Sequence, residues 1–244
     1  MKKITKISAV AMMAAAISVS ASAKEAGAAA TEEKSVGWTP IAIGLATPVQ
    51  MPWSFNWDVF GRDVNLAYAD ANRVAGVEVA LGGCVSRTYL AGLQVSAICN
   101  YNDGDLYGMQ AAICDINDDV YGFQASAFAM GKHVYGLQAN LLGAIATEEF
   151  WGLRVSGLAS LNNGKTAGAE ISGLVNLSRT VEGCQIALGY NQTEVLHGCQ
   201  IALVNYAQSS TTSAFQIGLV NIIRDNVVPV LPLVNGCFFD GTDR

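Results

Sequence analysis

The stretch Val181-Glu182-Gly183-Cys184-Gln185-Ile186-Ala187-Leu188 returns fifteen residues later, with few changes, as Leu196-His197-Gly198-Cys199-Gln200-Ile201-Ala202-Leu203. The glycine of this unit recurs every 14 to 16 residues through the chain, at Gly76, Gly92, Gly108, Gly122, Gly136, Gly152, Gly168, Gly183 and Gly198, with Ala214 in the equivalent place of a last copy. A short, regular period of this kind indicates an array of one repeated structural unit.

Each copy alternates in polarity around its glycine. Two residues after the glycine there is always a long polar side chain, namely Glu78, Gln94, Gln110, Gln124, Gln138, Arg154, Glu170, Gln185, Gln200 or Gln216. The residues one and three after it are mostly apolar, as in Leu93 and Val95. Alternation with a period of two predicts a strand with one apolar face and one polar or small face, and the glycine is expected at a bend between two short strands. We expect the apolar face to point inward.

Two all-β architectures fit one strand unit per 14 to 16 residues. The first is a β-solenoid of about ten rungs with an N-terminal cap, in which all rungs run parallel and equivalent residues stack about 4.8 Å apart. The second is an antiparallel outer-membrane β-barrel, whose natural repeat is a hairpin with turns of two different lengths. Odd and even copies look alike here, and this favours the solenoid.

The start of the chain is typical of a cleaved export signal. Residues 1–23 contain a basic start, an apolar run and the small-residue cleavage site Ala21-Ser22-Ala23. No later segment has about 18 uninterrupted apolar residues, as a membrane-spanning helix requires. The protein is therefore expected to be exported to the cell surface or the outer membrane, with the periplasm as the alternative.

The rest of the chain divides by composition into four regions. Residues 24–36 are expected to form a flexible leader, 37–73 an aromatic-rich N-terminal cap, 74–224 the repeat array, and 225–244 a C-terminal closing strand and tail. Removal of the signal leaves 11 basic and 20 acidic residues, a net charge near −9. Such a charge argues against nucleic acid and anionic membrane surfaces as partners.

The ending of the last copies provides a resemblance. The pattern glycine, apolar, Gln, apolar, small, Leu-Val-Asn occurs at Gly198–Asn205 and, with Ala in the first place, at Ala214–Asn221. This pattern resembles a family of bacterial exported surface repeat-containing proteins of unknown function, and the flanking elements Ala46–Pro52 and Leu231–Asn235 are similar to that family's flanks. The resemblance implies a cell-surface or outer-membrane address and no catalytic activity.

Cysteines and acidic residues are the first candidates for chemistry. Cys184 and Cys199 take the same position in adjacent copies, where they replace an inward Leu, and Cys84, Cys99 and Cys114 follow at intervals of fifteen. Stacked copies would bring some of these thiols within bridging distance, but Cys also serves as a small apolar residue. The run 102–119 is rich in Asp and Asn; it lacks the spacing of an EF-hand, and solvated turns are the simpler interpretation.

Four aromatic residues are the best candidate binding site. Tyr107, Tyr121, Tyr135 and Trp151 each precede the glycine in four consecutive copies, so stacked rungs would align them into a ribbon suited to a glycan or a protein partner. The same stacking predicts a ladder of Gln amides and an ion pair between Arg154 and Glu170.

No nucleophile, acid–base pair or metal-ligand cluster is recognisable in the sequence. We therefore predict no catalytic residue, no metal and no cofactor. The favoured function is a non-enzymatic exported protein with a structural or adhesive role at the cell surface or outer membrane. The alternative is an outer-membrane barrel that acts as a pore or scaffold.

Overall fold

A computed structural model describes residues 35, 37–46, 49–53, 57–211 and 213–237, and every element within them is a β-strand. The predicted signal (1–23) and leader (24–36) lie outside these residues except for Ser35. The strands are β1 (Gly37–Ala46), β2 (Val49–Met51), β3 (Trp57–Ala80), β4 (Gly83–Ser96), β5 (Cys99–Asn102), β6 (Asp105–Asn117), β7 (Asp119–Ser156), β8 (Ala159–Ser172), β9 (Val175–Ala187), β10 (Tyr190–Ile201), β11 (Val204–Ser210), β12 (Ala214–Ile223) and β13 (Val230–Cys237).

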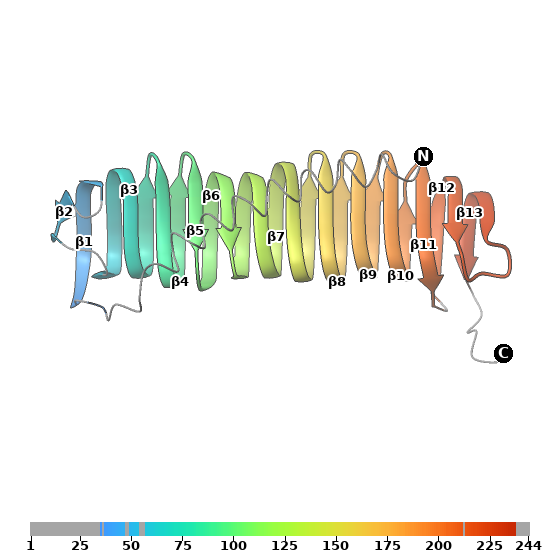
Figure 1. Ribbon diagram of the computed structural model, residues 1–244, viewed down its shortest axis with the longest axis horizontal. Coiled ribbons are helices and arrows are strands. Elements are labelled where there is room, and N and C mark those ends of the chain that lie inside the picture. Colours follow the sequence, from blue (N-terminus) through green and yellow to red (C-terminus); the bar gives the residue numbers. More distant parts are fainter. Residues whose placement is uncertain (1–34, 36, 47–48, 54–56, 212, 238–244) are drawn as a thin grey trace.

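The strands coil into a β-solenoid, as the sequence predicts, with about eleven turns where about ten were expected (Figure 1). Successive turns pair in parallel and in register, so that β10 places Gly198 beside Gly183, Cys199 beside Cys184 and Gln200 beside Gln185. The alternative barrel is wrong, because its neighbouring strands would run antiparallel, whereas here only the terminal strands β2 and β13 do so among the described residues.

The glycines form a ladder along the coil. From Gly61 to Gly198 each has a φ between 125° and 154°, in a region that side chains disfavour. A Cβ on any of Gly76 to Gly198 would collide with the carbonyl oxygen of the preceding glycine in the ladder. Glycine is therefore required at each bend for two reasons: its positive φ, and the close approach of two backbones. The ladder begins at Gly61, so part of the region expected as a cap already follows the coil.

The orientation of the strand faces differs from the expectation. The polar residues two places after each glycine point inward and are almost completely buried, whereas the apolar residues beside them point outward. Leu137, Leu153 and Ile217, for example, are 38–50% exposed. Cys184 and Cys199 likewise lie on the outer face and are only partly buried, so their placement as inward Leu substitutes is wrong.

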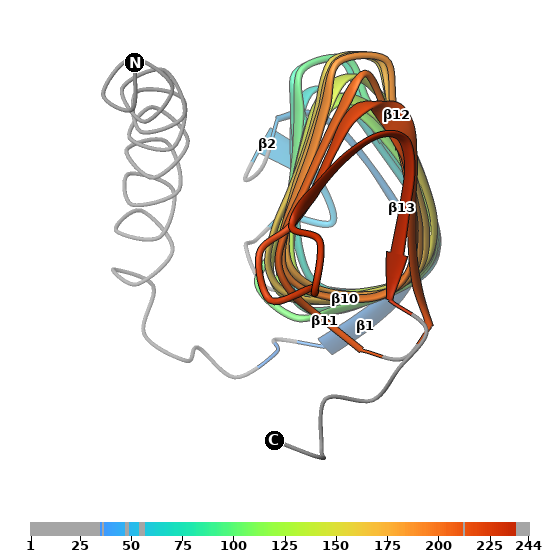
Figure 2. The same ribbon diagram turned by 90° about the vertical axis from the view of Figure 1, so that its right-hand side faces the viewer.

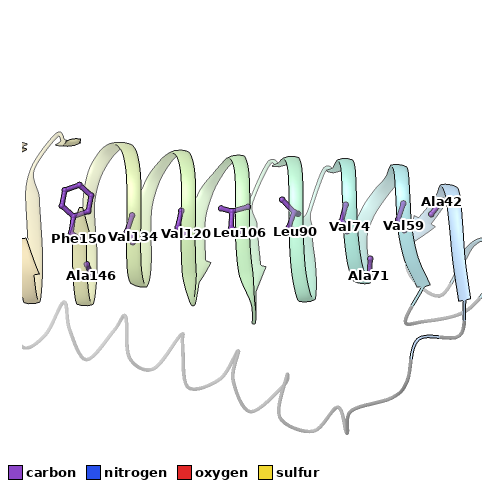
Figure 3. Packing of buried hydrophobic residues seen from close by; sticks show 10 residues of the cluster. All are labelled: Ala42, Val59, Ala71, Val74, Leu90, Leu106, Val120, Val134, Ala146 and Phe150. Atoms are coloured by element: carbon purple, nitrogen blue, oxygen red, sulfur yellow. The ribbon is translucent and has the colours of Figure 1, made fainter. Parts of the chain in front are cut away.

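An apolar column does lie inside, two residues before each glycine. Val74, Leu90, Leu106, Val120 and Phe150 stack on equivalent places of successive turns and are completely buried (Figure 3). Burial of side chains of this size stabilises the coil by about 1.5–3 kcal/mol each. The interior thus combines one apolar column with columns of Gln and of Asn, Ser or Ala inside a single closed outline (Figure 2).

The predicted amide ladder is confirmed, and it is continuous. Gln94 Nε2 donates to Glu78 at 2.6 Å, and Gln110 Nε2 donates to Gln94 Oε1 at 3.0 Å. The same donation to the preceding turn is made by Gln124, Gln138, Gln185, Gln200 and Gln216. Each amide from Gln94 to Gln200 both donates and accepts, so the column satisfies groups whose burial without partners would cost about 1–3 kcal/mol each. The Oε1 of the last amide, Gln216, lacks a partner among the described residues.

The predicted ion pair between Arg154 and Glu170 lies in the middle of the amide ladder and bonds to the amides on both sides. Arg154 Nε donates to Gln138 Oε1 at 2.7 Å, and its Nη1 donates to Glu170 Oε1 at 3.2 Å. Glu170 also accepts from Gln185 at 2.9 Å. Both charged side chains are fully buried, and the Arg154 guanidinium lies 4.1 Å from the ring centre of Phe150. An arginine that only donates is thus followed by a glutamate that only accepts. Donation reverses between these two residues alone, and the amides on both sides of the pair donate toward the preceding turn.

Antiparallel strands finish the sheet at both ends. β2 folds back on β1, and β13 pairs with β12 in place of a further parallel turn. Pro229 and Pro232 lie beside and within β13 and have no backbone N–H to donate, which discourages further strands from pairing with this edge. The predicted closing strand is therefore present, within Val230–Cys237.

We predict that Arg154→Gln and Glu170→Gln are each destabilising but compensate one another. The first substitution turns an amide oxygen toward the Glu170 carboxylate, and the second turns an amide N–H toward the Arg154 guanidinium. Each single variant should lose about 3–5 kcal/mol of unfolding free energy, as expected when a buried pair is broken. The double variant restores an all-amide ladder and should lie within about 1–2 kcal/mol of the parent. Denaturant unfolding of the four chains measures the coupling, and strictly additive losses would contradict the ladder.

Candidate functional site

The four aromatic residues proposed as a binding site do form a ribbon on the outer surface. The ring centres of Tyr107 and Tyr121 lie 4.9 Å apart and those of Tyr121 and Tyr135 lie 5.1 Å apart, with planes within 7° of parallel. Trp151 continues the ribbon at 6.5 Å with a tilt of 33°. The stacking follows directly from the register, in which β6 and β7 place Tyr107 beside Tyr121.

The geometry limits what the ribbon can bind. Each central ring has its two faces turned toward the rings above and below, so a sugar cannot lie flat on Tyr121. The exposed parts are the ring edges and hydroxyl groups, and Tyr107, Tyr121 and Trp151 remain 38–47% exposed. The ribbon therefore suits a partner that contacts a row of edges more than one that stacks on a single ring.

Hydrogen-bonding groups lie along one side of the ribbon. Tyr107 donates its hydroxyl proton to Asp105 Oδ2 at 3.1 Å, and Tyr135 donates to Glu149 Oε2 at 3.3 Å. The hydrogen bond to Asp105 raises the pKa of Tyr107, while burial first and then Glu149 raise the pKa of Tyr135. Both phenols therefore stay protonated at neutral pH and keep their donor role.

A small ion-pair network continues this side. His133 lies between two carboxylates, with Nδ1 at 2.7 Å from Asp119 and Nε2 at 3.0 Å from Glu148. The hydrogen bond to Asp119 is the main cause of the raised pKa of His133, which favours the imidazolium. Lys165 lies 5.5 Å from the ring centre of Trp151, which places a cation over the last ring of the ribbon. The repeat pattern of the sequence did not predict this network, because its members lie outside the positions that recur in every copy.

The other side of the ribbon is apolar. The residues two places further along each strand are Met109, Phe123, Leu137 and Leu153, of which Met109 and Leu137 are about half exposed. The ribbon thus marks a boundary between a charged edge and an apolar wall of the coil. Sequence reasoning missed this boundary because it placed the apolar residues inside.

Two of the cysteine pairs that the spacing suggests do stack, but Cys84 lies in register with Asn100 and not with Cys99, and all six cysteines are free. Cys99 pairs in register with Cys114, and Cys184 pairs in register with Cys199. The hydrogen bond between the thiols of Cys99 and Cys114 raises the pKa of the former and lowers that of the latter. Cys84 is fully buried, and burial raises the pKa of its thiol.

The acidic run at 102–119 is divided by the strand alternation. Asp115 points inward and is fully buried beside Asn100, which donates to it at 3.0 Å, while Asp118 and Asp119 point outward and pair with Lys132 and His133. Within the residues that the structure describes, no group of three or more His, Cys, Asp or Glu could hold a metal ion.

Two buried carboxylates end the amide ladder at the N-terminal side. Asp63 and Glu78 occupy equivalent places in adjacent turns, and both are completely buried. Burial is the main cause that raises the pKa of both carboxyl groups, to about 7 for Asp63 and well above the usual range for Glu78. The charge of Asp70 further raises the pKa of Asp63, and the charges of Asp63 and then Asp70 further raise that of Glu78. Asp63 Oδ2 and Glu78 Oε1 lack hydrogen-bond partners among the described residues. The pair is sealed from solvent, so its chemistry concerns stability and not a substrate.

Comparison of the chain with known protein families, with curated proteins and with solved structures finds no match. Among the described residues, no helix has the length and hydrophobicity needed to cross a membrane.

We predict that the coil loses stability as the pH rises from about 4 to about 7. Asp63 and Glu78 hold protons more tightly when folded, so their contribution is complete below their unfolded pKa values and declines as the pH passes toward the folded ones. Glu78→Gln accepts from Gln94 without carrying a charge, and should raise the unfolding free energy at pH 8 by about 1–3 kcal/mol and flatten the pH profile.

The measurement is denaturant unfolding at several pH values, with Glu194→Gln as a control at an acid whose side chain is 58% exposed. Equal destabilisation by Glu78→Gln at every pH would show that Glu78 is not protonated in the folded chain.

Proposed function

We propose that the chain is a non-enzymatic exported protein of the cell surface or outer membrane, with a structural or adhesive role. The observation that carries this proposal is the repetition of the same outward side chain on consecutive turns, shown most clearly by the parallel rings of Tyr107, Tyr121 and Tyr135. A surface that repeats about every 4.8 Å suits an extended partner, such as a glycan or a protein, better than a small substrate.

The use of polar groups in the coil supports a structural role. Buried Gln, Arg154 and Glu170 bind one another along the axis and so have no free face toward a reactant. The outward titratable groups beside the ribbon are paired among themselves, as His133 is with Asp119 and Glu148. These contacts position and rigidify the surface.

The proposed address rests on the sequence. The basic, apolar and small-residue regions of 1–23 support export, and the repeat pattern at Gly198–Asn205 supports the resemblance to exported surface repeat proteins. The coil contributes a compatible shape, because a rod closed at both ends by antiparallel strands presents long faces for contact.

We predict that Tyr121→Ala combined with Tyr135→Ala removes adhesive binding and leaves the fold intact, because both rings lie outside the core. The matched control is Tyr101→Ala combined with Tyr206→Ala, which removes two tyrosines from the other wall of the coil. Retention of each purified chain on isolated cell envelopes is measured before and after periodate oxidation or protease digestion of the envelopes.

Treatment-sensitive binding is the part of the retention that disappears after periodate or protease. It should fall at least tenfold in the ribbon variant and remain mostly unchanged in the control. Loss after periodate identifies a glycan and loss after protease identifies a protein. If the ribbon variant retains its full treatment-sensitive binding, the ribbon is not the adhesive site.

We predict that Lys132 and Lys165 react with a membrane-impermeant amine reagent on intact cells, because their side chains are 42% and 35% exposed on the charged edge. Mass spectrometry of the recovered chain reads the modification, and cells with a permeabilised outer membrane serve as the control. Modification that requires permeabilisation would place the chain in the periplasm and refute the surface address.

A further inference from the structure

Exposed charge is absent from more than half of the coil's circumference, here called the uncharged half. In each of ten successive turns, one segment holds either no charged residue or one that points inward. It runs from the residue after the glycine through the following bend and into the next strand: 77–86, 93–102, 109–117, 123–131, 137–147, 153–162, 169–178, 184–193, 199–207 and 215–223. The four charged residues in these segments, Glu78, Asp115, Arg154 and Glu170, are all completely buried.

The outward residues of this half are mostly apolar and culminate in a ridge. The ridge runs through similar places of successive turns, partly in the short gaps between strands and partly within β6, β7 and β12. It is made of Leu81, Ile98, Ile113, Leu141, Leu158, Leu174, Leu188, Leu203 and Leu219, each 42–73% exposed. Strand spacings place about 1,500 Å² of surface on the ridge and its two walls. The largest apolar patch on a typical soluble monomer is only about 300–600 Å².

Tyrosines border the uncharged half on both sides. On one wall the border is the aromatic ribbon, where Tyr107 and Tyr135 direct their hydroxyl groups to Asp105 and Glu149 of the charged edge. On the other wall Tyr101 directs its hydroxyl to Asp103 at 3.4 Å, and Tyr206 lies in the equivalent column. Rings beside apolar residues with hydroxyls turned to charged ones are the arrangement found where proteins meet the surface of a membrane.

We propose that the uncharged half of the solenoid is embedded in one leaflet of a lipid membrane, with the coil axis parallel to the membrane plane and the leucine ridge deepest. The inference deepens the proposed surface or outer-membrane role and rests on it. The two tyrosine borders then lie at the level of the lipid head groups, and the charged edge faces water.

The dimensions and the backbone agree with this placement. From the borders to the ridge each wall extends roughly 10–20 Å at about 3.3 Å per residue, and the apolar half of a bilayer is about 15 Å deep. The walls expose no unpaired backbone groups along their length, because each turn bonds to the turns on both sides, as in the register of β9 with β8 and β10. Apolar surroundings demand this of any backbone that enters them.

Lipid explains the surface better than a second copy of the chain does. The apolar surface is convex, with walls on both sides of the ridge, so one flat partner covers a single wall, whereas acyl chains cover both. Protein interfaces also carry about one hydrogen bond per 100–200 Å², and the walls between the tyrosine borders offer few outward polar side chains. The net negative charge of the chain further favours zwitterionic over anionic lipid.

The test is co-flotation of the full chain with phosphatidylcholine vesicles, which contain neither glycan nor protein. The ridge variant Leu174→Glu with Leu188→Glu adds two charges at exposed positions, and Asn163→Glu with Gln208→Glu adds the same two charges at exposed positions of the charged edge. Circular dichroism and thermal unfolding of the three chains establish that each remains folded. Sedimentation velocity without lipid reports self-association.

The parent and the edge variant should float at both 0.05 M and 0.5 M salt, and the ridge variant should lose at least tenfold in its partition to vesicles. Failure of the parent to float would overturn the proposal. Flotation of the folded ridge variant equal to that of the parent would also overturn it. So would a parent chain that is dimeric and does not bind lipid, if the ridge variant is monomeric. A chain that labels on intact cells but fails to float would retain its surface address and lose only the lipid contact.

Discussion

The close approach of one glycine to the carbonyl oxygen of the preceding glycine is the contact on which the coil depends. Ten glycines from Gly61 to Gly198 adopt the same positive φ, and a Cβ at any of Gly76 to Gly198 would strike the preceding glycine's carbonyl group. A shift of one residue between turns would place a side chain at this point. The contact therefore fixes the register at each turn, and every column of stacked side chains follows from that register.

Fixed register makes a polar interior stable. A buried Gln has both a donor and an acceptor, and only an identical neighbour at a constant distance along the axis satisfies both, as Gln110 does between Gln94 and Gln124. Where another residue replaces Gln in the column, the balance of donors and acceptors still decides which residue fits. Arg154 donates to both neighbours and Glu170 accepts from both. Asp63 and Glu78 would be two adjacent acceptors, but their raised pKa values favour the protonated forms, which carry no charge.

The glycine spacing predicted the solenoid, the amide ladder, the Arg154–Glu170 pair and the alignment of Tyr107, Tyr121 and Tyr135, because each depends only on which residues are equivalent. It did not predict which strand face is inside. Alternation assigns residues to two faces but does not orient them, and the usual rule of apolar residues inside fails where stacked amides satisfy one another. Gly61 was missed because the sequence around it, from Trp57 to Arg73, lacks the Gln and resembles the repeat only in its spacing.

The inward amides also account for the outer surface. A coil of 14 to 16 residues per turn has a narrow interior, and the Gln and Asn columns together with one column of Val, Leu and Phe fill it. The remaining apolar residues of each turn must then lie outside, where water gives them no stability. Their confinement to the uncharged half of the circumference, between borders that contain Tyr107 and Tyr101, is not needed to close the coil. A requirement outside the fold accounts for that distribution, and contact with an apolar environment is the one that the leucine ridge meets.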